Sequence, residues 1–129
     1  MSFPHSRLRR LRQSSEMLSL TSETRLSVED FVYPMFVIHG HGKKIPIEPM
    51  PGIYQLSVDM LAEEIKEVTS LGIQSVLLFG IPETKDAIGS GGIDTNGVIQ
   101  VAIREIKSLD PNLIVMTDVC LCDYTDHGH

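Results

Sequence analysis

The sequence has few cysteines, no long apolar run and no excess of positive charge. Its 129 residues include only two cysteines, Cys120 and Cys122, so the disulfide framework of a small secreted domain is not expected. No stretch reaches the roughly 18 apolar residues that a membrane-spanning helix needs. The formal net charge of −6 argues against a general nucleic-acid-binding surface. With 42% hydrophobic residues, the chain fits one globular domain.

Charge is distributed unevenly along the chain. Residues 1–30 contain five Arg and four acidic residues, a net of +1, whereas the remainder contains six Lys or Arg and thirteen acidic residues, a net of −7. We interpret residues 1–30 as an arm that docks on a partner subunit. A solvated terminus and an organelle transit peptide are the alternatives. No apolar region typical of a secretion signal precedes the body, so the expected compartment is the cytoplasm.

Apolar spacing predicts three strands separated by two helices, which is the order of an α/β fold with a parallel sheet. An open doubly wound sheet and a (β/α)₈ barrel share this order, and periodicity does not separate them. Three strands also leave two exposed edges, so we expect something else to complete the sheet. The predicted strands are 31–38 (with a complete ladder only after Pro34), 73–79 and 113–117, and the predicted helices run from an N-cap at Ser57 to a C-cap at Gly72 and from about 94 to 109.

The last twelve residues concentrate side chains that bind metals. Two thiols, three carboxylates and two imidazoles follow the third predicted strand, where α/β proteins assemble their sites. We expect Cys120 and Cys122 to be poorly placed to bridge each other, on the grounds that successive side chains alternate in an extended segment and that a tight loop strains a disulfide. Thiolates favour zinc, so a zinc site is one interpretation. Two half-buried thiols beside loop histidines are the other.

Two further segments are weaker candidates. Residues 89–92 (Gly-Ser-Gly-Gly) precede a helix and could hold a phosphate, but they lack the established nucleotide-binding patterns, so a mobile loop is preferred. His39 and His41 could bind a metal weakly, although solvent-facing loop histidines are the preferred interpretation.

The string from Asp118 to His129 (Asp-Val-Cys-Leu-Cys-Asp-Tyr-Thr-Asp-His-Gly-His) closely resembles the zinc-binding signature of the porphobilinogen synthase family, also called 5-aminolevulinate dehydratase. The resemblance covers nearly the whole chain, in family order. Its other segments are 9–12 (Arg-Arg-Leu-Arg), 23–26 (Glu-Thr-Arg-Leu), 33–37 (Tyr-Pro-Met-Phe-Val), 50–54 (Met-Pro-Gly-Ile-Tyr), 77–80 (Leu-Leu-Phe-Gly) and 97–107.

This resemblance implies a (β/α)₈ TIM barrel whose N-terminal arm wraps a neighbouring subunit, usually within an octamer. Residues 1–30 would be the arm, and residues 31–129 would cover roughly the first three strands. The family is a lyase that condenses two 5-aminolevulinate molecules into porphobilinogen, with loss of two waters, in tetrapyrrole (heme) biosynthesis. Three cysteines hold its Zn²⁺; Cys120 and Cys122 match the first two, and Asp118 matches an active-site aspartate. The residues do not show whether an allosteric Mg²⁺ also binds.

The same resemblance implies that parts of the site lie elsewhere. The family's third zinc cysteine follows the position of His129, and its two Schiff-base lysines lie further on. None of the five lysines here matches their motifs, and a barrel needs about 250 residues. We therefore expect the isolated 129-residue chain to be inactive and poorly stable. Two non-catalytic alternatives are a fragment that binds zinc through Cys120, Cys122, His127 and His129, and a module that only docks on full-length subunits.

Overall fold

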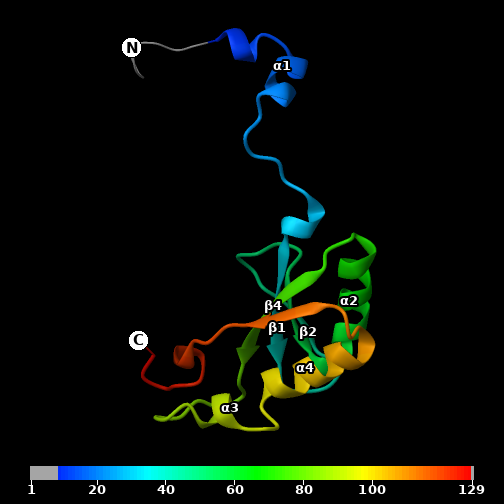
Figure 1. Ribbon diagram of the computed structural model, residues 1–129. Helices are drawn as coiled ribbons and strands as arrows, with labels where there is room; N and C mark the ends of the chain where they lie inside the picture. Colours follow the sequence, from blue (N-terminus) through cyan, green and yellow to red (C-terminus); the bar gives the residue numbers. More distant parts are fainter. Residues whose placement is uncertain (1–8, 129) are drawn as a thin grey trace.

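A computed structural model describes residues 9–128, and its centre is a five-stranded sheet with the order β2–β3–β1–β4–β5 (Figure 1). The strands are β1 (Val32–Ile38), β2 (Lys44–Pro46), β3 (Tyr54–Ser57), β4 (Ser75–Ile81) and β5 (Ile114–Thr117). The α-helices are α1 (Ser15–Leu20), α2 (Leu61–Ser70), α3 (Ser90–Ile93) and α4 (Val98–Leu109). Four short 3₁₀ helices are η1 (Arg10–Arg12), η2 (Val28–Asp30), η3 (Val58–Met60) and η4 (Leu121–Asp123).

Three parallel strands, joined in chain order through helices, form the predicted α/β core. β1 pairs with β4, and β4 pairs with β5, both in parallel. The connection from β3 to β4 contains α2, and the connection from β4 to β5 contains α4. Pro34 lies inside β1, but the ladder from β1 to β3 starts only at Phe36, as expected for a residue without an N–H donor.

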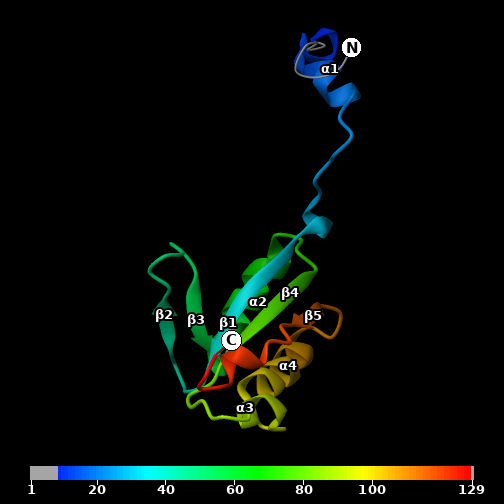
Figure 2. The same cartoon turned by 90° about the vertical axis from the view of Figure 1, so that its left-hand side faces the viewer.

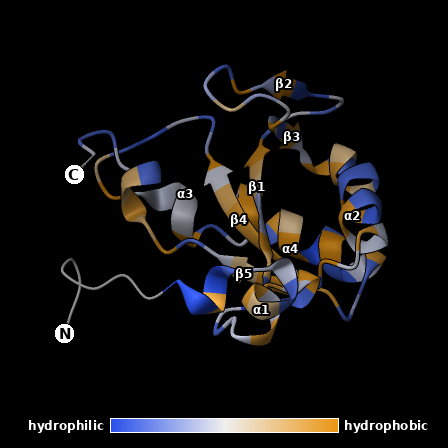
Figure 3. Ribbon diagram, turned by 90° about the horizontal axis from the view of Figure 1, so that it is seen from above, coloured by the Kyte–Doolittle hydropathy of each residue, from blue (hydrophilic) through white to orange (hydrophobic). Residues whose placement is uncertain are grey.

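Both long helices pack on one face of the sheet, where the main hydrophobic core lies (Figure 2). Figure 3 shows that β1 and β4 are hydrophobic along most of their length. Their side chains meet apolar residues spaced three or four apart on α2 and α4, which is the spacing that predicted these helices. The core residues with no more than 4% exposure include Val37, Leu56, Leu61, Ile65, Val68, Val76, Leu78, Val98, Ala102 and Ile106.

The opposite face of the sheet is also apolar but is not covered within residues 9–128. In register, Pro34 lies beside Leu77, and Leu77 lies beside Met116, which is 41% exposed. The next row pairs Phe36 with Phe79, whose rings stack with centroids 5.2 Å apart. A sheet apolar on both faces is typical of parallel strands whose second face is also buried in the complete fold.

The structure contains a hairpin that the sequence did not predict. β2 pairs antiparallel with β3, and the Lys44 ammonium lies 4.6 Å from the centre of the Tyr54 ring. Ser57 is fully buried at the end of β3, where its hydroxyl accepts from the Lys43 N–H (2.9 Å) and donates to Asp59 (2.7 Å). Ser57 is the N-cap residue of η3, which runs directly into α2 at Leu61, so the predicted start of the helical segment is confirmed, but the Ser57 side chain makes no capping hydrogen bond. Gly72 does follow α2 with φ +85°, as predicted.

Residues 9–30 project away from the sheet (Figures 1 and 2). They carry η1, α1 and η2, and none of their residues is buried. Several large apolar side chains are exposed there: Leu11, Leu18, Leu20, Leu26 and Val28. Contact with a partner subunit remains a prediction, and residues 1–8 of the expected arm lie outside the described residues. Among the described residues, no helix is long and apolar enough to span a membrane.

Candidate metal and substrate site

The carboxyl ends of β1, β4 and β5 bring three loops to one edge of the sheet. These loops are residues 39–43, 82–97 and 118–128, and we call the last one the cysteine segment. The N–H of Asp118 donates to the Leu78 carbonyl (3.2 Å), which continues the contact between β4 and β5 past the last strand residue. A cleft of about 510 Å³ opens here, with His39, Glu83 and Tyr124 among its lining residues. A parallel α/β sheet places binding sites at this edge.

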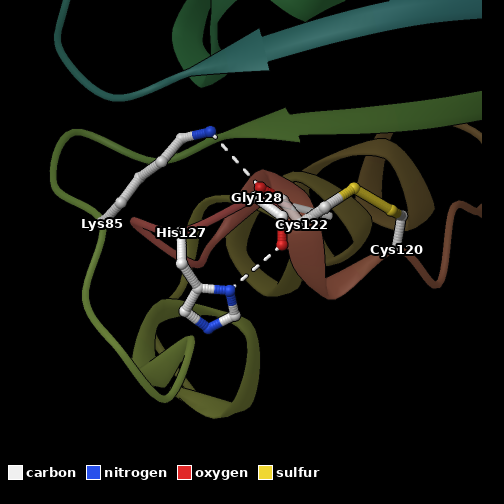
Figure 4. The surroundings of a disulfide bond; sticks show 5 residues. All are labelled: Lys85, Cys120, Cys122, His127 and Gly128. Carbon is white, nitrogen blue, oxygen red and sulfur yellow. Dashed lines mark hydrogen bonds between the residues drawn. A yellow bond between two sulfur atoms is a disulfide. The ribbon is translucent and has the colours of Figure 1, made fainter.

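Cys120 and Cys122 are joined by a disulfide in the structure (Figure 4). The expectation that they are poorly placed to bridge is wrong, because residues two apart point to the same side of an extended segment and the chain then turns at Leu121, between the two cysteines. β5 ends at Thr117, and η4 turns immediately after Cys120, so the two Cα atoms lie 5.4 Å apart. That separation is in the normal range for a disulfide.

The same turn makes the pair suitable for binding a soft metal once it is reduced. Two neighbouring thiolates are donors that zinc prefers, and a mononuclear site needs at least one further protein ligand. Among residues 9–128, no group of three or more His, Cys, Asp and Glu side chains is arranged to hold a metal. The donor chemistry therefore fits two of the ligands of a zinc ion, and metal binding by this pair remains a prediction.

The other histidines near this edge do not join the cysteines. His41 is 92% exposed and lies 3.2 Å from the Asp59 carboxylate, in agreement with the solvent-facing interpretation, whereas His39 lines the cleft. The Nδ1 atom of His127 faces the Gly128 carbonyl at 3.1 Å (Figure 4). Asp118 is exposed and borders a small pocket of about 200 Å³ together with Cys120. Its catalytic role stays a prediction, and His129 lies outside the described residues.

Sequence reasoning missed Asp86 and Lys85, which contact the cysteine segment from the loop after β4. The Lys85 ammonium donates to the Cys122 carbonyl at 3.5 Å (Figure 4). Asp86 forms a parallel bridge with Thr125, and hydrogen bonds from Ser90 lower the pKa of its carboxyl group. The sequence pattern that could have predicted this turn is an Asp four residues before a Ser in a glycine-rich loop, because Asp side chains accept backbone hydrogen bonds in such turns.

Tyr124 packs against the loop that contains residues 89–92. A Cβ at Gly91 or Gly92 would lie 3.4 or 3.5 Å from the Tyr124 ring, and one at Gly80 would lie 2.5 Å from its hydroxyl oxygen. Only Gly80 is required by the close approach of the ring, because 3.4–3.5 Å is an ordinary contact distance, and Gly89 is favoured by its φ of +63°. The loop therefore has a packing contact with Tyr124, and phosphate binding by residues 89–92 remains untested. Burial, followed by the nearby carboxylates of Asp123 and Asp118, raises the pKa of Tyr124.

Comparison with known proteins gives a match over almost the entire chain. The family profile described as delta-aminolevulinic acid dehydratase matches residues 5–129. The chain belongs to this family. It is similar to the delta-aminolevulinic acid dehydratase of Staphylococcus epidermidis, with 50% identity over 123 residues, which are 95% of this chain and 38% of the relative. The enzyme of the same name from Bacillus subtilis is 47% identical over 129 residues, which are 100% of this chain and 40% of the relative.

A solved structure of this family supports the barrel over the doubly wound sheet. The delta-aminolevulinic acid dehydratase (porphobilinogen synthase) of Toxoplasma gondii, in complex with its reaction product porphobilinogen, superimposes with a TM-score of 0.87 at 29% identity. The match covers 96% of this chain and 36% of that one. The predicted fold class is therefore confirmed: the chain corresponds to part of the family's (β/α)₈ barrel, and it spans about two fifths of the length of the curated relatives.

Proposed function

We propose that this chain supplies the N-terminal arm, the first barrel strands and two zinc ligands of a zinc-dependent porphobilinogen synthase. The reaction is the condensation of two 5-aminolevulinate molecules into porphobilinogen, with loss of two waters, in heme biosynthesis. The observation that carries the proposal is the placement of Cys120 and Cys122 in a turn directly after β5, in a chain whose residues 5–129 match the family. The match over the whole chain favours this function over a fragment that only binds zinc or docks.

The chain's own residues would contribute binding and orientation to this reaction. Cys120 and Cys122, as thiolates, would hold Zn²⁺, which supplies Lewis acidity toward a substrate carbonyl or amine when bound. Asp118 lies on the same short segment and would orient the substrate amine. The uncovered apolar face formed by Leu77, Phe79 and their neighbours would become the packed barrel interior. The Schiff-base lysines of the family have no proposed counterpart among the five lysines present.

The proposal extends to assembly and compartment. Residues 1–30 would contact a neighbouring subunit of a homo-oligomer, an octamer as in the family, since their exposed leucines have no partner in the described part of this chain. Thiolates that serve as metal ligands must stay reduced, which supports a cytoplasmic location. An allosteric Mg²⁺ site is carried over from the family resemblance alone.

The metal assignment is tested by zinc binding to the complete protein encoded by the gene of this chain, which we call the natural gene product, in its reduced form. We expect one zinc per chain after reduction, measured by elemental analysis after gel filtration. Replacing either cysteine by serine should abolish stoichiometric binding, because the pair supplies two soft ligands.

His127→Ala is the matched control, because this side chain faces the Gly128 carbonyl rather than the sulfurs. Retained zinc in this variant supports the proposed ligand set. Loss of zinc in His127→Ala, or full zinc content in the cysteine variants, would contradict it.

A further inference from the structure

The loop between β4 and α3 is folded around one carboxylate, that of Asp86. Its Oδ1 atom accepts hydrogen bonds from the N–H groups of Ile88 (3.1 Å) and Ser90 (3.0 Å), and its Oδ2 atom accepts the Ser90 hydroxyl. Three donors on one carboxylate close a tight turn over residues 86–90. This turn determines where the backbone of Asp86 lies.

The backbone of Asp86 is hydrogen-bonded to the cysteine segment through both its N–H and its carbonyl group. Its N–H donates to the Tyr124 carbonyl (3.2 Å), and its carbonyl accepts from the Asp126 N–H (3.1 Å). Thr125, between these two residues, is only 8% exposed. The segment thus has a fixed attachment two to four residues after Cys122.

Further contacts make this attachment a rigid one. The Lys85 ammonium donates to the Cys122 carbonyl itself. Tyr124 packs against the backbone of Gly91 and Gly92 in the same connection. Within the cysteine segment, η4 closes through hydrogen bonds from the N–H groups of Tyr124 and Thr125 to the Leu121 carbonyl, both 2.9 Å. Displacement of the Asp86 turn would therefore change the geometry of the turn that carries both sulfurs.

We propose that Asp86 is a positioning residue for the cysteine pair. It acts through the backbone of the cysteine segment, without contact to the sulfurs, and the proposal rests on the proposed zinc function. Residues that orient metal ligands from outside the coordination sphere contribute about 10–100-fold to metal affinity. We expect an effect in that range from the Asp86 carboxylate.

Three variants of the natural gene product separate this role from a general effect on folding. Asp86→Ala removes the acceptors of the turn. Asp86→Asn keeps an Oδ1 acceptor for the N–H groups of Ile88 and Ser90 and gains an N–H donor for the Ser90 hydroxyl. This variant should therefore keep the turn and the zinc affinity. Asp94→Ala removes a similar turn carboxylate, which accepts only from the Asn96 N–H among the described residues and does not contact the cysteine segment.

The test measures zinc dissociation constants of the reduced proteins by competition with a chromogenic chelator. The sulfur-to-cobalt charge-transfer absorption of the Co²⁺ forms is recorded as well. We expect Asp86→Ala to weaken zinc binding by about 10-fold or more and to alter the cobalt spectrum. Asp86→Asn and Asp94→Ala should remain close to the unsubstituted protein. Unchanged affinity and spectrum in Asp86→Ala, or an equal loss in Asp94→Ala, would overturn the proposal.

Amide hydrogen exchange decides the proposal independently of the metal. In the reduced, metal-free protein, Asp86→Ala should accelerate exchange of the Asp126 amide, whose acceptor is the Asp86 carbonyl. If the unsubstituted protein binds no zinc through its cysteines, the proposed zinc function fails. Unaltered exchange at Asp126 would then overturn the positioning role as well, whereas accelerated exchange would support it.

Discussion

At the scale of single residues, Gly80 shows how tightly the edge of the sheet is packed. It lies in β4, where a Cβ would come within 2.5 Å of the Ile99 side chain and of the Tyr124 hydroxyl oxygen. Atoms at that distance overlap, so a larger residue forces α4 or the cysteine segment to move. This single position therefore couples β4, α4 and the candidate site.

Gly80→Ala should lower the free energy of unfolding by about 1–3 kcal/mol, the usual cost of overpacking. Urea denaturation of the natural gene product, followed by circular dichroism, measures the change. Gly92→Ala is the matched control, because its Cβ would meet nothing closer than 3.5 Å. Equal stability of the two variants would show that the close approach at Gly80 is not required.

The cysteine pair also shows, at residue scale, what the sequence can predict and what it cannot. The residue types alone indicate a zinc-binding pair, because thiolates are soft ligands. Alternation along a strand places the two side chains on the same side, but their close approach depends on η4, which begins between them at Leu121 and which the sequence did not predict. The role of Asp86 was hidden for a similar reason, because its bridge to Thr125 joins residues far apart in the sequence.

At the scale of elements, the strands and helices with strong apolar spacing were predictable, and the hairpin was not. α2, α4, β1 and β4 bury apolar residues at regular intervals, and β5 alternates exposed with partly buried residues, which a sequence displays directly. β2 has only three residues, all exposed, and contains a proline. Directly before β2, the Lys43 N–H donates to the buried Ser57 hydroxyl of β3. This contact joins residues fourteen positions apart, so no local sequence pattern predicts it.

Ser57→Ala should loosen the attachment of Lys43, directly before β2, to the end of β3. The substitution removes the side-chain acceptor of the Lys43 N–H, and a typical hydrogen bond of this kind contributes about 0.5–1.5 kcal/mol to the free energy of unfolding. Hydrogen exchange at the Lys43 amide should accelerate, with exchange in β4 unchanged.

Ser70→Ala is the control for this element, because within residues 9–128 the exposed Ser70 hydroxyl bonds only the Glu67 carbonyl of its own helix. It should leave the Lys43 amide protected. An equally protected Lys43 amide in Ser57→Ala would mean that β2 is held by the β3 ladder alone.

At the scale of the whole molecule, four parallel strands and two covering helices match part of the family's barrel, and residues 9–30 project from it. The apolar face opposite the helices is the side on which a barrel packs its interior, which explains why Phe36 and Phe79 stack there without cover in the described residues. The candidate site lies at the carboxyl end of this sheet, the end at which barrel enzymes place their chemistry. The chain spans about two fifths of the length of these relatives, so its contribution to the reaction is best tested within a full-length enzyme.

That test is a chimera in which this chain replaces the matching 40% of the Bacillus subtilis relative. Porphobilinogen formation from 5-aminolevulinate is measured with added zinc, and folding is checked by circular dichroism. Our account predicts that the chimera forms porphobilinogen and that replacing Cys120 and Cys122 by serine abolishes this activity. A folded chimera that forms none, or one that keeps full activity without both cysteines, would contradict it.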